Sequence, residues 1–526
     1  MAFFLSTLFL FVSSFAFLLF VWNKQWRNNT SNKREEDGNK KQLPPGPVKL
    51  PIIGNLHQLG ELPHRSLHLM SLRHGPLMFL KLGSVPLIVA SSADTARELI
   101  KNHDLAISNR PVTYAQRKLS YGCADMVFAP YGEYWRQVRK LCTLELLSLK
   151  RAQSFRAVRE EEVALLLDSI AKYSTSSSSS TIINLSESVL NLVNDIVCRT
   201  AFGKKYREVG HKYSCYGSKA GSRVNSILAE FQELLATISV LDFFPHMEWI
   251  HKFTGWDSKL GKIFRELDAF YDELIEAHQN PESKRSSSVG EDDLVDVLIK
   301  VYKDRSLGIS LTMDNIKGVL TDIFVAGTDT SSALVIWAMA ELMRNPSGMK
   351  KAQEELRKAI GKKERVEESD LHGLDYLKAI IKETFRVHPP VPLLVPRETT
   401  EEFTFDGYTI PAKAQIFVNA RAIGLDPKCW EYPEEYRPER FLNSPIDYKG
   451  QHFELIPFGA GRRGCPGINF ATPTVELTLA NLLHRFDWEF PPGMGIADLD
   501  MKEAIGMTTH KRIPLQLVAI PKAYTY

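Results

Sequence analysis

The strongest chemical signal in the sequence is one cysteine, Cys465, in a run (residues 458–467) that also holds several glycines and a proline. Glycine permits positive φ and close backbone approach, and proline lacks an N–H donor, so the run predicts an irregular loop. Apolar residues follow at helical spacing, so Cys465 lies just before a helix whose free N–H groups and dipole stabilise a thiolate. The neighbouring Arg462 and Arg463 strengthen that field. The pattern predicts a cysteine placed to be an anion.

The glycines leave space above the thiolate, so a flat macrocycle could lie there with the sulfur as its axial ligand. The nearby arginines would pair with acidic groups on the edge of that macrocycle. A haem has both properties. Two alternatives compete. A lone cysteine often only packs in the core. Gly459, Gly461 and Gly464 also fit the G-x-G-x-x-G spacing of a dinucleotide site, and Asp487 follows about twenty residues later. Pro466 and the two arginines occupy the turn, however, and the remaining chain is too short for further βαβ units, so the context favours the haem ligand.

A long apolar segment without proline, residues 313–342, predicts a central buried helix. The stretch 326–331 interrupts it with a glycine, an acid and hydroxyls, and such violations in a buried helix tend to be functional. By default this stretch predicts an N-cap or a kink. Above a haem, its small residues would leave room for dioxygen, Thr330 would hold the dioxygen, and Asp329 would relay protons from water.

Two further pairs of residues share a helix face. Trp135 and Arg139 are four apart, so an indole and a guanidinium can reach the same acidic group. Glu383 and Arg386 are three apart, and alone they would be a routine surface pair of small value. These pairs need further context before they indicate a function.

That context comes from the loop: Phe458, Gly461, Arg463, Cys465 and Gly467 match the Phe-x-x-Gly-x-Arg-x-Cys-x-Gly haem loop of the cytochrome P450 monooxygenases. The sequence resembles this family over most of its length, and it is most similar to the plant microsomal A-type clan, in the manner of family 71. In that family the cysteine thiolate is the axial ligand of haem b and favours O–O cleavage. The resemblance implies the P450 fold, mainly α with small β-sheets, with Cys465 bound to the haem iron.

The same resemblance assigns the other site residues. Besides the loop, it places these residues at the haem: Trp135, Arg139, Ala326, Gly327 and Arg397. It gives the catalytic acid and alcohol roles to Asp329 and Thr330. It gives a buried network that supports the haem loop to Glu383, Arg386 and Arg440. By analogy with the family's cavity positions, the apolar substrate pocket is lined by Val391, Leu393, Leu394, Ile505 and Met507.

Composition agrees with a large enzyme. The chain has 526 residues, 44% of them hydrophobic and 24% charged, with a net charge of +3, so a nucleic-acid partner is disfavoured. Its cysteines are scattered without a disulfide framework, as in a reducing compartment. Residues 77–80 and 87–90 predict strands of a small sheet, and the region from there to residue 127 predicts irregular structure.

The N-terminus predicts a membrane anchor. Residues 2–22 carry no charge and span about 31 Å as a helix, enough to cross a bilayer. The run lacks the basic start and small-residue cleavage site of a signal peptide, and its basic flank predicts that the rest of the chain faces the cytosol. We therefore predict an anchor (1–22), a polar linker (23–43) and a catalytic domain (44–526) at the endoplasmic reticulum membrane.

The resemblance implies a monooxygenase that uses O₂ and NADPH, receives its electrons from an NADPH–cytochrome P450 reductase, and admits cytochrome b5 as a second donor. The implied substrate is a small, largely apolar plant specialised metabolite, with a terpenoid favoured over an alkaloid or a phenolic. Two other functions stay open. An oxygen-independent haem-thiolate isomerase or dehydratase is disfavoured by the intact pair of Asp329 and Thr330, and a non-catalytic haem sensor would need neither that pair nor an apolar cavity.

Overall fold

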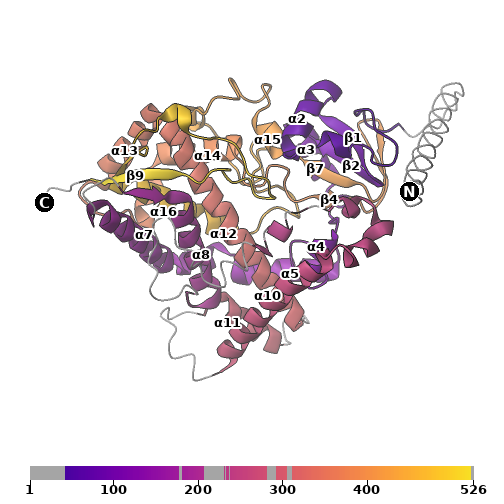
Figure 1. Ribbon diagram of the computed structural model, residues 1–526, viewed down its shortest axis with the longest axis horizontal. Helices are drawn as coiled ribbons and strands as arrows, with labels where there is room; N and C mark the ends of the chain where they lie inside the picture. Colours follow the sequence, from indigo (N-terminus) through magenta and orange to yellow (C-terminus); the bar gives the residue numbers. More distant parts are fainter. Residues whose placement is uncertain are drawn as a thin grey trace, which may run out of the picture.

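Helix α12 (Met313–Arg344) crosses the middle of the computed structural model and carries the stretch 326–331 (Figure 1). The Thr312 hydroxyl begins the helix by accepting a hydrogen bond from the N–H of Asn315 at 3.2 Å. Residues 331–343 are all buried, so the predicted central helix is confirmed. Among the residues that the structure describes, α12 alone is long and apolar enough to cross a membrane, and its burial within the protein marks it as a core helix.

The structure describes residues 42–176, 181–205, 230–231, 233–235, 237, 239–280, 292–304 and 311–522. The predicted anchor and nearly all of the predicted linker lie outside these ranges. The other α-helices are α2 (Pro63–His74), α3 (Ala93–Asn102), α4 (Tyr114–Leu119), α5 (Glu133–Leu141), α6 (Leu149–Ser154), α7 (Arg156–Ser176), α8 (Leu185–Phe202), α10 (Trp256–Gln279), α11 (Leu294–Lys303), α13 (Pro346–Ile360), α14 (Asp375–Val387), α15 (Ala420–Gly424) and α16 (Ile468–Arg485).

Small sheets complete the fold. The largest among the described residues has the strand order β1-β2-β7-β4, in which β2 and β7 run parallel and the other neighbours run antiparallel. A second sheet has the order β3-β9-β8, and β5 pairs with β6. The strands are β1 (Leu77–Leu82), β2 (Val85–Ala90), β3 (Ile182–Asn184), β4 (Arg397–Glu398), β5 (Phe403–Phe405), β6 (Tyr408–Ile410), β7 (Gln415–Val418), β8 (Phe486–Glu489) and β9 (Gln516–Pro521). The predicted strands at 77–80 and 87–90 are confirmed and are longer than predicted.

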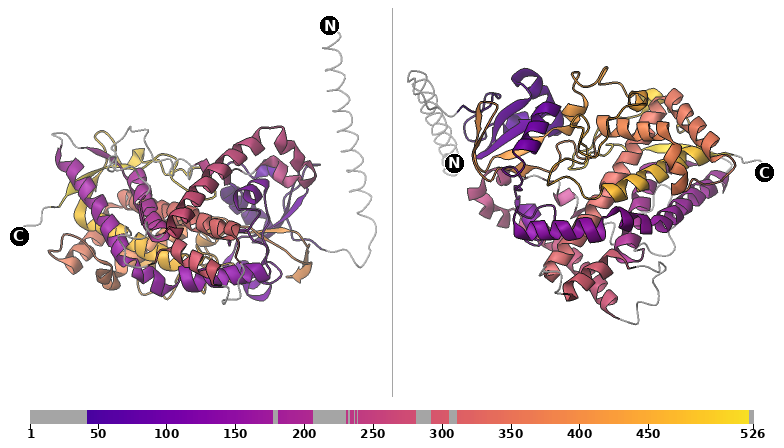
Figure 2. Two further views of the ribbon diagram at one scale, coloured as in Figure 1. Left: turned by 90° about the horizontal axis from the view of Figure 1, so that it is seen from below. Right: turned by 180° about the vertical axis from the view of Figure 1, so that it is seen from behind.

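The apolar core surrounds α12. Its C-terminal half packs with α7, α8, α13, α14 and α16 in one large cluster. Its N-terminal half packs with α5, α8, α10 and α11 in a second cluster. The sheet of β1, β2 and β7 lies at the opposite end of the molecule from α7, α13 and β9 (Figures 1 and 2). Helix α12 therefore contributes residues to both of these apolar clusters.

One prediction about the fold is wrong. The region up to residue 127 was expected to be irregular, but it contains α3 and α4. The Ser92 side chain accepts a hydrogen bond from the N–H of Thr95 and caps α3, while Thr113 and Gln116 form a capping box on α4. Short polar side chains at helix N-termini satisfy free N–H groups, and these capping signals were readable in the sequence.

Candidate functional site

The loop around Cys465 takes its shape from its glycines. Gly459 and Gly461 have φ values of 68° and 70°, in the left-handed region that glycine adopts without strain. The Cys465 N–H donates to the carbonyl of Phe458 at 2.8 Å. Gly467 is the N-cap of α16, and its N–H donates to the Cys465 sulfur at 3.4 Å. The loop thus presents the sulfur at the N-terminus of a helix, as predicted.

Gly461 has a further constraint. A Cβ on this residue would lie 2.7 Å from Oδ1 of Asp104 and 2.8 Å from Cγ2 of Ile100. Asp104 also accepts a hydrogen bond from the N–H of Arg462 at 3.0 Å, so it cannot move freely. The positive φ and the close neighbours both require glycine at this position.

Cys465 is exposed to solvent, yet protein surrounds it closely enough that burial raises the pKa of its thiol. The sulfur is therefore open to solvent while protein atoms lie densely around it. The Gly467 N–H and the charge of Arg139 act in the opposite direction and lower the pKa, but burial outweighs them. The helix N–H thus favours the thiolate, as predicted, and a metal ion bound to the sulfur would deprotonate the thiol.

Arg463, next to Gly464 in the loop, points into the protein. It is buried, and it donates to the carbonyls of Ser108 at 2.8 Å and Ala129 at 2.6 Å. Its guanidinium lies 4.2 Å from the ring centroid of Trp135, a cation–π contact. Burial and the positive charges of neighbouring arginines lower the pKa of Arg463 to about 9.

Two of those neighbouring arginines hold the loop from other elements. Arg397 of β4 donates to the carbonyl of Ala460 at 2.6 Å and to Asp104 at 2.7 Å. Arg139 of α5 donates to the carbonyl of Gly464 at 2.6 Å. Each arginine is thus anchored to the backbone of the loop that carries Cys465.

A fourth arginine, Arg110, was missed in the sequence. It is buried, and it donates to the carbonyls of Val395 at 2.6 Å and Pro396 at 2.7 Å. Burial and the charges of Arg397 and Arg463 lower its pKa well below the ordinary value. Arg110 lies beside a proline in a loop, outside any helical or strand pattern in the sequence. Its place in this cluster is therefore seen only in the folded structure.

The four arginines carry more positive charge than their protein partners neutralise. Within the described part of the chain, Arg110, Arg139 and Arg463 form no ion pair, and Arg397 pairs with Asp104. A cluster with excess positive charge beside an accessible cysteine fits a flat ligand with anionic groups on one edge. The residues present therefore fit a haem, whose two propionates would meet the arginines.

The structure does not bring Trp135 and Arg139 to one acceptor. The Trp135 indole N–H donates to the carbonyl of Met126 at 3.0 Å, while Arg139 reaches the carbonyl of Gly464. The indole lies under Arg463 instead. Trp135 is therefore placed to hold an arginine of the cluster in position.

The interrupted stretch of α12 behaves differently from the rest of the helix. Ala326 is exposed although it lies within the central helix, so side chains leave the space beside it unfilled. The Thr330 hydroxyl donates to the carbonyl of Ala326 at 2.8 Å, one turn earlier. Gly327 lies against α8, where an added Cβ would be 3.3 Å from Val197. Ala326 thus opens space beside the helix, while Gly327 allows α12 and α8 to approach closely.

Asp329 has a partner that the sequence did not indicate. Its Oδ1 lies 2.7 Å from Nε2 of His510, in the segment between η9 (Ile496–Asp498) and β9. Burial opposes protonation of that imidazole, but the hydrogen bond and the charge of Asp329 outweigh it and raise the pKa of His510. The two residues lie far apart in the sequence, so no spacing rule predicted their contact.

Glu383, Arg386 and Arg440 lie together. The Glu383 carboxylate accepts two hydrogen bonds from Arg386, at 2.7 and 2.8 Å, and one from Arg440 at 3.0 Å. It also accepts the N–H of Arg437 at 2.7 Å. The side chains of Glu383 and Arg386 are fully buried. The bond from Arg440 to Glu383 joins α14 to η8 (Pro438–Phe441).

The predicted substrate-pocket residues divide into two groups. Val391, Leu393 and Leu394 are half-buried in the segment before β4, and Leu394 has a φ of 53°. Met507 is half-buried near the C-terminus, whereas Ile505 is 69% exposed. The first group lies beside the elements that position the arginine cluster, and Ile505 lies at the surface.

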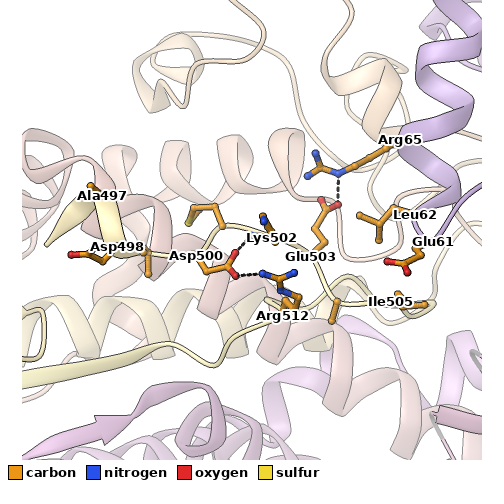
Figure 3. Close-up of a pocket in the computed structure, with 13 residues that line it drawn as sticks. Glu61, Leu62, Arg65, Ala497, Asp498, Asp500, Lys502, Glu503, Ile505 and Arg512 are labelled. Carbon is orange, nitrogen blue, oxygen red and sulfur yellow. Dashed lines mark hydrogen bonds and ion pairs between the residues drawn. The ribbon is translucent and has the colours of Figure 1, made fainter. Parts of the chain in front are cut away.

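Ile505 lines a surface pocket of about 810 Å³ that is rich in charged side chains (Figure 3). Glu503, also in its wall, accepts hydrogen bonds from His64 at 2.9 Å and Arg65 at 2.6 Å. Burial opposes ionisation of Glu503, but these hydrogen bonds outweigh it and hold the pKa of the carboxyl well below its usual range. Glu503 thereby ties the C-terminal segment to α2.

Comparison with known proteins agrees with this geometry. The sequence profile described as Cytochrome P450 matches residues 44–516. The chain is 55% identical to Cytochrome P450 71A9 of Glycine max, over 98% of this chain and 99% of that protein. It is 51% identical to Strychnine-11-hydroxylase of Strychnos nux-vomica, over 93% of each. A solved zebrafish cytochrome P450 structure with abiraterone has a TM-score of 0.70 at 23% identity, covering 88% of this chain and 99% of that one.

Proposed function

The chain belongs to the cytochrome P450 family, among plant 71A-type members, and from this membership we propose that it oxidises a small, largely apolar plant specialised metabolite with O₂. The oxidoreductase class follows from the family and the fold. The oxygen-independent isomerase and the haem sensor are less well supported, because Asp329 and Thr330 lie beside the exposed Ala326 in α12.

The proposed haem site lies between the Cys465 loop and α12. The observation that carries this proposal is the four-arginine cluster beside an accessible cysteine. Cys465 would ligate the iron, and Arg139, Arg397, Arg463 and Arg110 would meet the propionates. Haem bound there supplies the redox chemistry that activates O₂.

The chain's own residues would control protons and water at this site. The Thr330 hydroxyl, which now donates to the Ala326 carbonyl, can turn to donate to a ligand in the space that Ala326 leaves open. Asp329, one residue earlier, is a carboxylate able to pass a proton toward that space. The apolar Val391, Leu393 and Leu394 would exclude water and hold an apolar substrate.

The family membership also supports a proposal for the electron donor and for the membrane at which the protein acts. Members of the P450 family generally need a redox partner, so we assign the electrons to an NADPH–cytochrome P450 reductase at the endoplasmic reticulum membrane. An exposed apolar surface on η3 (Val240–Phe243) and η4 (Pro245–Lys252), with Trp249 at 60% and the adjoining Phe253 at 79% exposure, supports membrane contact in addition to the anchor. Deletion of residues 2–22 should weaken membrane binding without removing the haem.

The substrate proposal has two candidates. The apolar lining of the proposed pocket supports a terpenoid. An alkaloid is favoured by a specific observation, because two relatives, at 51% and 43% identity, carry the names Strychnine-11-hydroxylase and Norfluorocurarine oxidase. Both substrate classes are small and largely apolar, so the same pocket accommodates either.

The test uses microsomes that contain the full chain and a reductase. A panel of terpenoids, alkaloids and phenolics is supplied with NADPH, with and without O₂, and the products are identified by mass spectrometry. The proposal expects a product that carries oxygen from ¹⁸O₂ and forms only with NADPH. Conversion of a substrate without O₂ would instead establish the isomerase or dehydratase function.

A further inference from the structure

The histidine that binds Asp329 is held in a fixed position by its neighbour. Thr509 is buried, its N–H donates to the carbonyl of Pro390 at 2.9 Å, and its own carbonyl accepts the indole N–H of Trp337 at 2.8 Å. Trp337 lies on α12, two turns beyond Asp329. The C-terminal segment is therefore fastened to α12 at Thr509, and this fixes the adjacent His510 against Asp329.

On its other side, His510 borders a recess between α8 and α12. The recess has a volume of about 310 Å³, and its walls include Glu187, Ser332, Ala333, Ile336 and His510. The three α12 residues lie three, four and seven positions after Asp329, so they share its helix face. The volume is enough for several water molecules.

His510 can exchange protons with this recess. Its side chain is 37% exposed, while its Nε2 lies against Asp329. The other charged groups at the recess are Glu187 of α8 and Lys511, whose ammonium group is directed to the carbonyl of Asp500. Asp329 is thus the acid that faces the imidazole, and it raises the pKa of His510 against the effect of burial.

We propose that His510 positions Asp329 and supplies it with protons from the recess between α8 and α12, so that the C-terminal segment is part of the proton path. This inference rests on the proposed monooxygenase function. In it, His510 acts through Asp329 as a positioning residue, and the recess is the water-filled entry for protons.

The proton transfer balances without any further reactant. Protonated His510 transfers its Nε2 proton to Asp329, which leaves a neutral imidazole and a neutral carboxyl. Loss of the ion pair frees the ring to turn, so that the bare Nε2 faces the recess and takes a new proton from water there, and bulk solvent restores that water. Asp329 passes its proton toward Thr330 and becomes a carboxylate again, ready to rebind the imidazolium. One proton has then moved from solvent to the site.

The test compares three variants of the full-length holoenzyme with a reductase. His510→Gln keeps a hydrogen-bond donor to Asp329 but cannot be protonated. Asp329→Asn removes the acid itself. His388→Gln is the matched control, because His388 forms a similar 2.7 Å contact with an α12 carboxylate, that of Glu341, which lies three turns from Asp329. Peroxide released per NADPH, product formed and KM are measured for each.

We expect His510→Gln and Asp329→Asn to raise the peroxide fraction and to lower product turnover by about 10²-fold, the lower end of positioned proton transfer. KM should change little, and the rate should show an enlarged solvent deuterium isotope effect. His388→Gln should keep the wild-type peroxide fraction. If Asp329→Asn uncouples the enzyme but His510→Gln does not, the role of His510 is wrong and the proposed function stands. If neither variant uncouples it, the proton path is wrong. Absence of any oxygenated product from the wild-type enzyme would instead overturn the proposed function.

A second measurement does not depend on activity. Because the pKa of His510 is raised in the folded state, the stabilisation by its charge is fully present below the unfolded pKa of about 6.5 and is lost as pH rises through the folded value. The difference in urea midpoint between wild type and His510→Gln should therefore be larger at pH 6 than at pH 9. An equal difference at both pH values would show that no imidazolium pairs with Asp329, and would overturn the proposal.

Discussion

Glu383→Gln removes one charge from a fully buried ion pair while keeping the shape of the side chain. Glu383 accepts four hydrogen bonds, two of them from Arg386, and neither side chain is exposed. Removing one partner of a buried pair typically costs about 3–5 kcal/mol, because the other charge stays buried without compensation. Arg386 would still donate to the carbonyls of Gly424, Pro433 and Glu435. We therefore expect the lower end of this range, about 3 kcal/mol.

The assay is urea unfolding of the detergent-solubilised holoenzyme, followed by far-ultraviolet circular dichroism. The matched control is Asp168→Asn, which breaks the surface pair with Arg365, whose two side chains are 58% and 43% exposed. Such a pair contributes less than about 1 kcal/mol. Haem content should also fall in Glu383→Gln, since Phe385 of the same helix packs on Phe458 at a centroid distance of 5.1 Å. If Glu383→Gln costs no more than Asp168→Asn, the network is not a support of the loop.

Other predictions concern the loop, the pH response and the alcohol of α12. Gly461→Ala should lower the haem-to-protein ratio, measured by the pyridine haemochrome assay, because its Cβ would lie 2.7 Å from Asp104 and its φ is positive, a strain of about 1–3 kcal/mol. Glu503 has a lowered pKa, so its contribution to stability is present above the unfolded pKa of about 4.3 and is lost as pH falls. The cost of Glu503→Gln in urea unfolding should thus stay nearly constant between pH 7 and pH 5 and shrink as pH falls below 4, and a cost that stays constant down to pH 2.5 would contradict this. Thr330→Ala should leave haem content unchanged but raise peroxide release, and unchanged coupling would remove Thr330 from the proton path.

The fold was predictable where apolar residues recur along the sequence with a clear period. Residues 313–342 are apolar on most faces and lack proline, a pattern that predicts a buried helix, so α12 was predicted almost to its ends. Helix α3 was missed because the helix-breaking Pro111 and Gly122 later in the same region indicate irregular structure. Its apolar face and its cap at Ser92 were local signals that pointed the other way.

The site was predictable only as far as motifs extend along the chain. The loop around Cys465 is one continuous run of sequence, and its glycines and proline indicate directly that its backbone is irregular. Arg110 and His510 have no such run, because their partners at Val395 and Asp329 are 285 and 181 residues away. Contacts of this kind depend on the packing of whole elements.

The most direct test of the central claim is the spectrum of the reduced carbon monoxide complex in wild type and Cys465→Ser. Serine keeps the shape of the side chain but replaces the sulfur with a hydroxyl that does not ionise near neutral pH. The account predicts the strongly red-shifted Soret band of thiolate-bound haem in the wild-type protein, and its loss together with oxygenation in the variant. A folded Cys465→Ser protein that binds haem and retains the red-shifted band would contradict the assignment of Cys465 as the iron ligand.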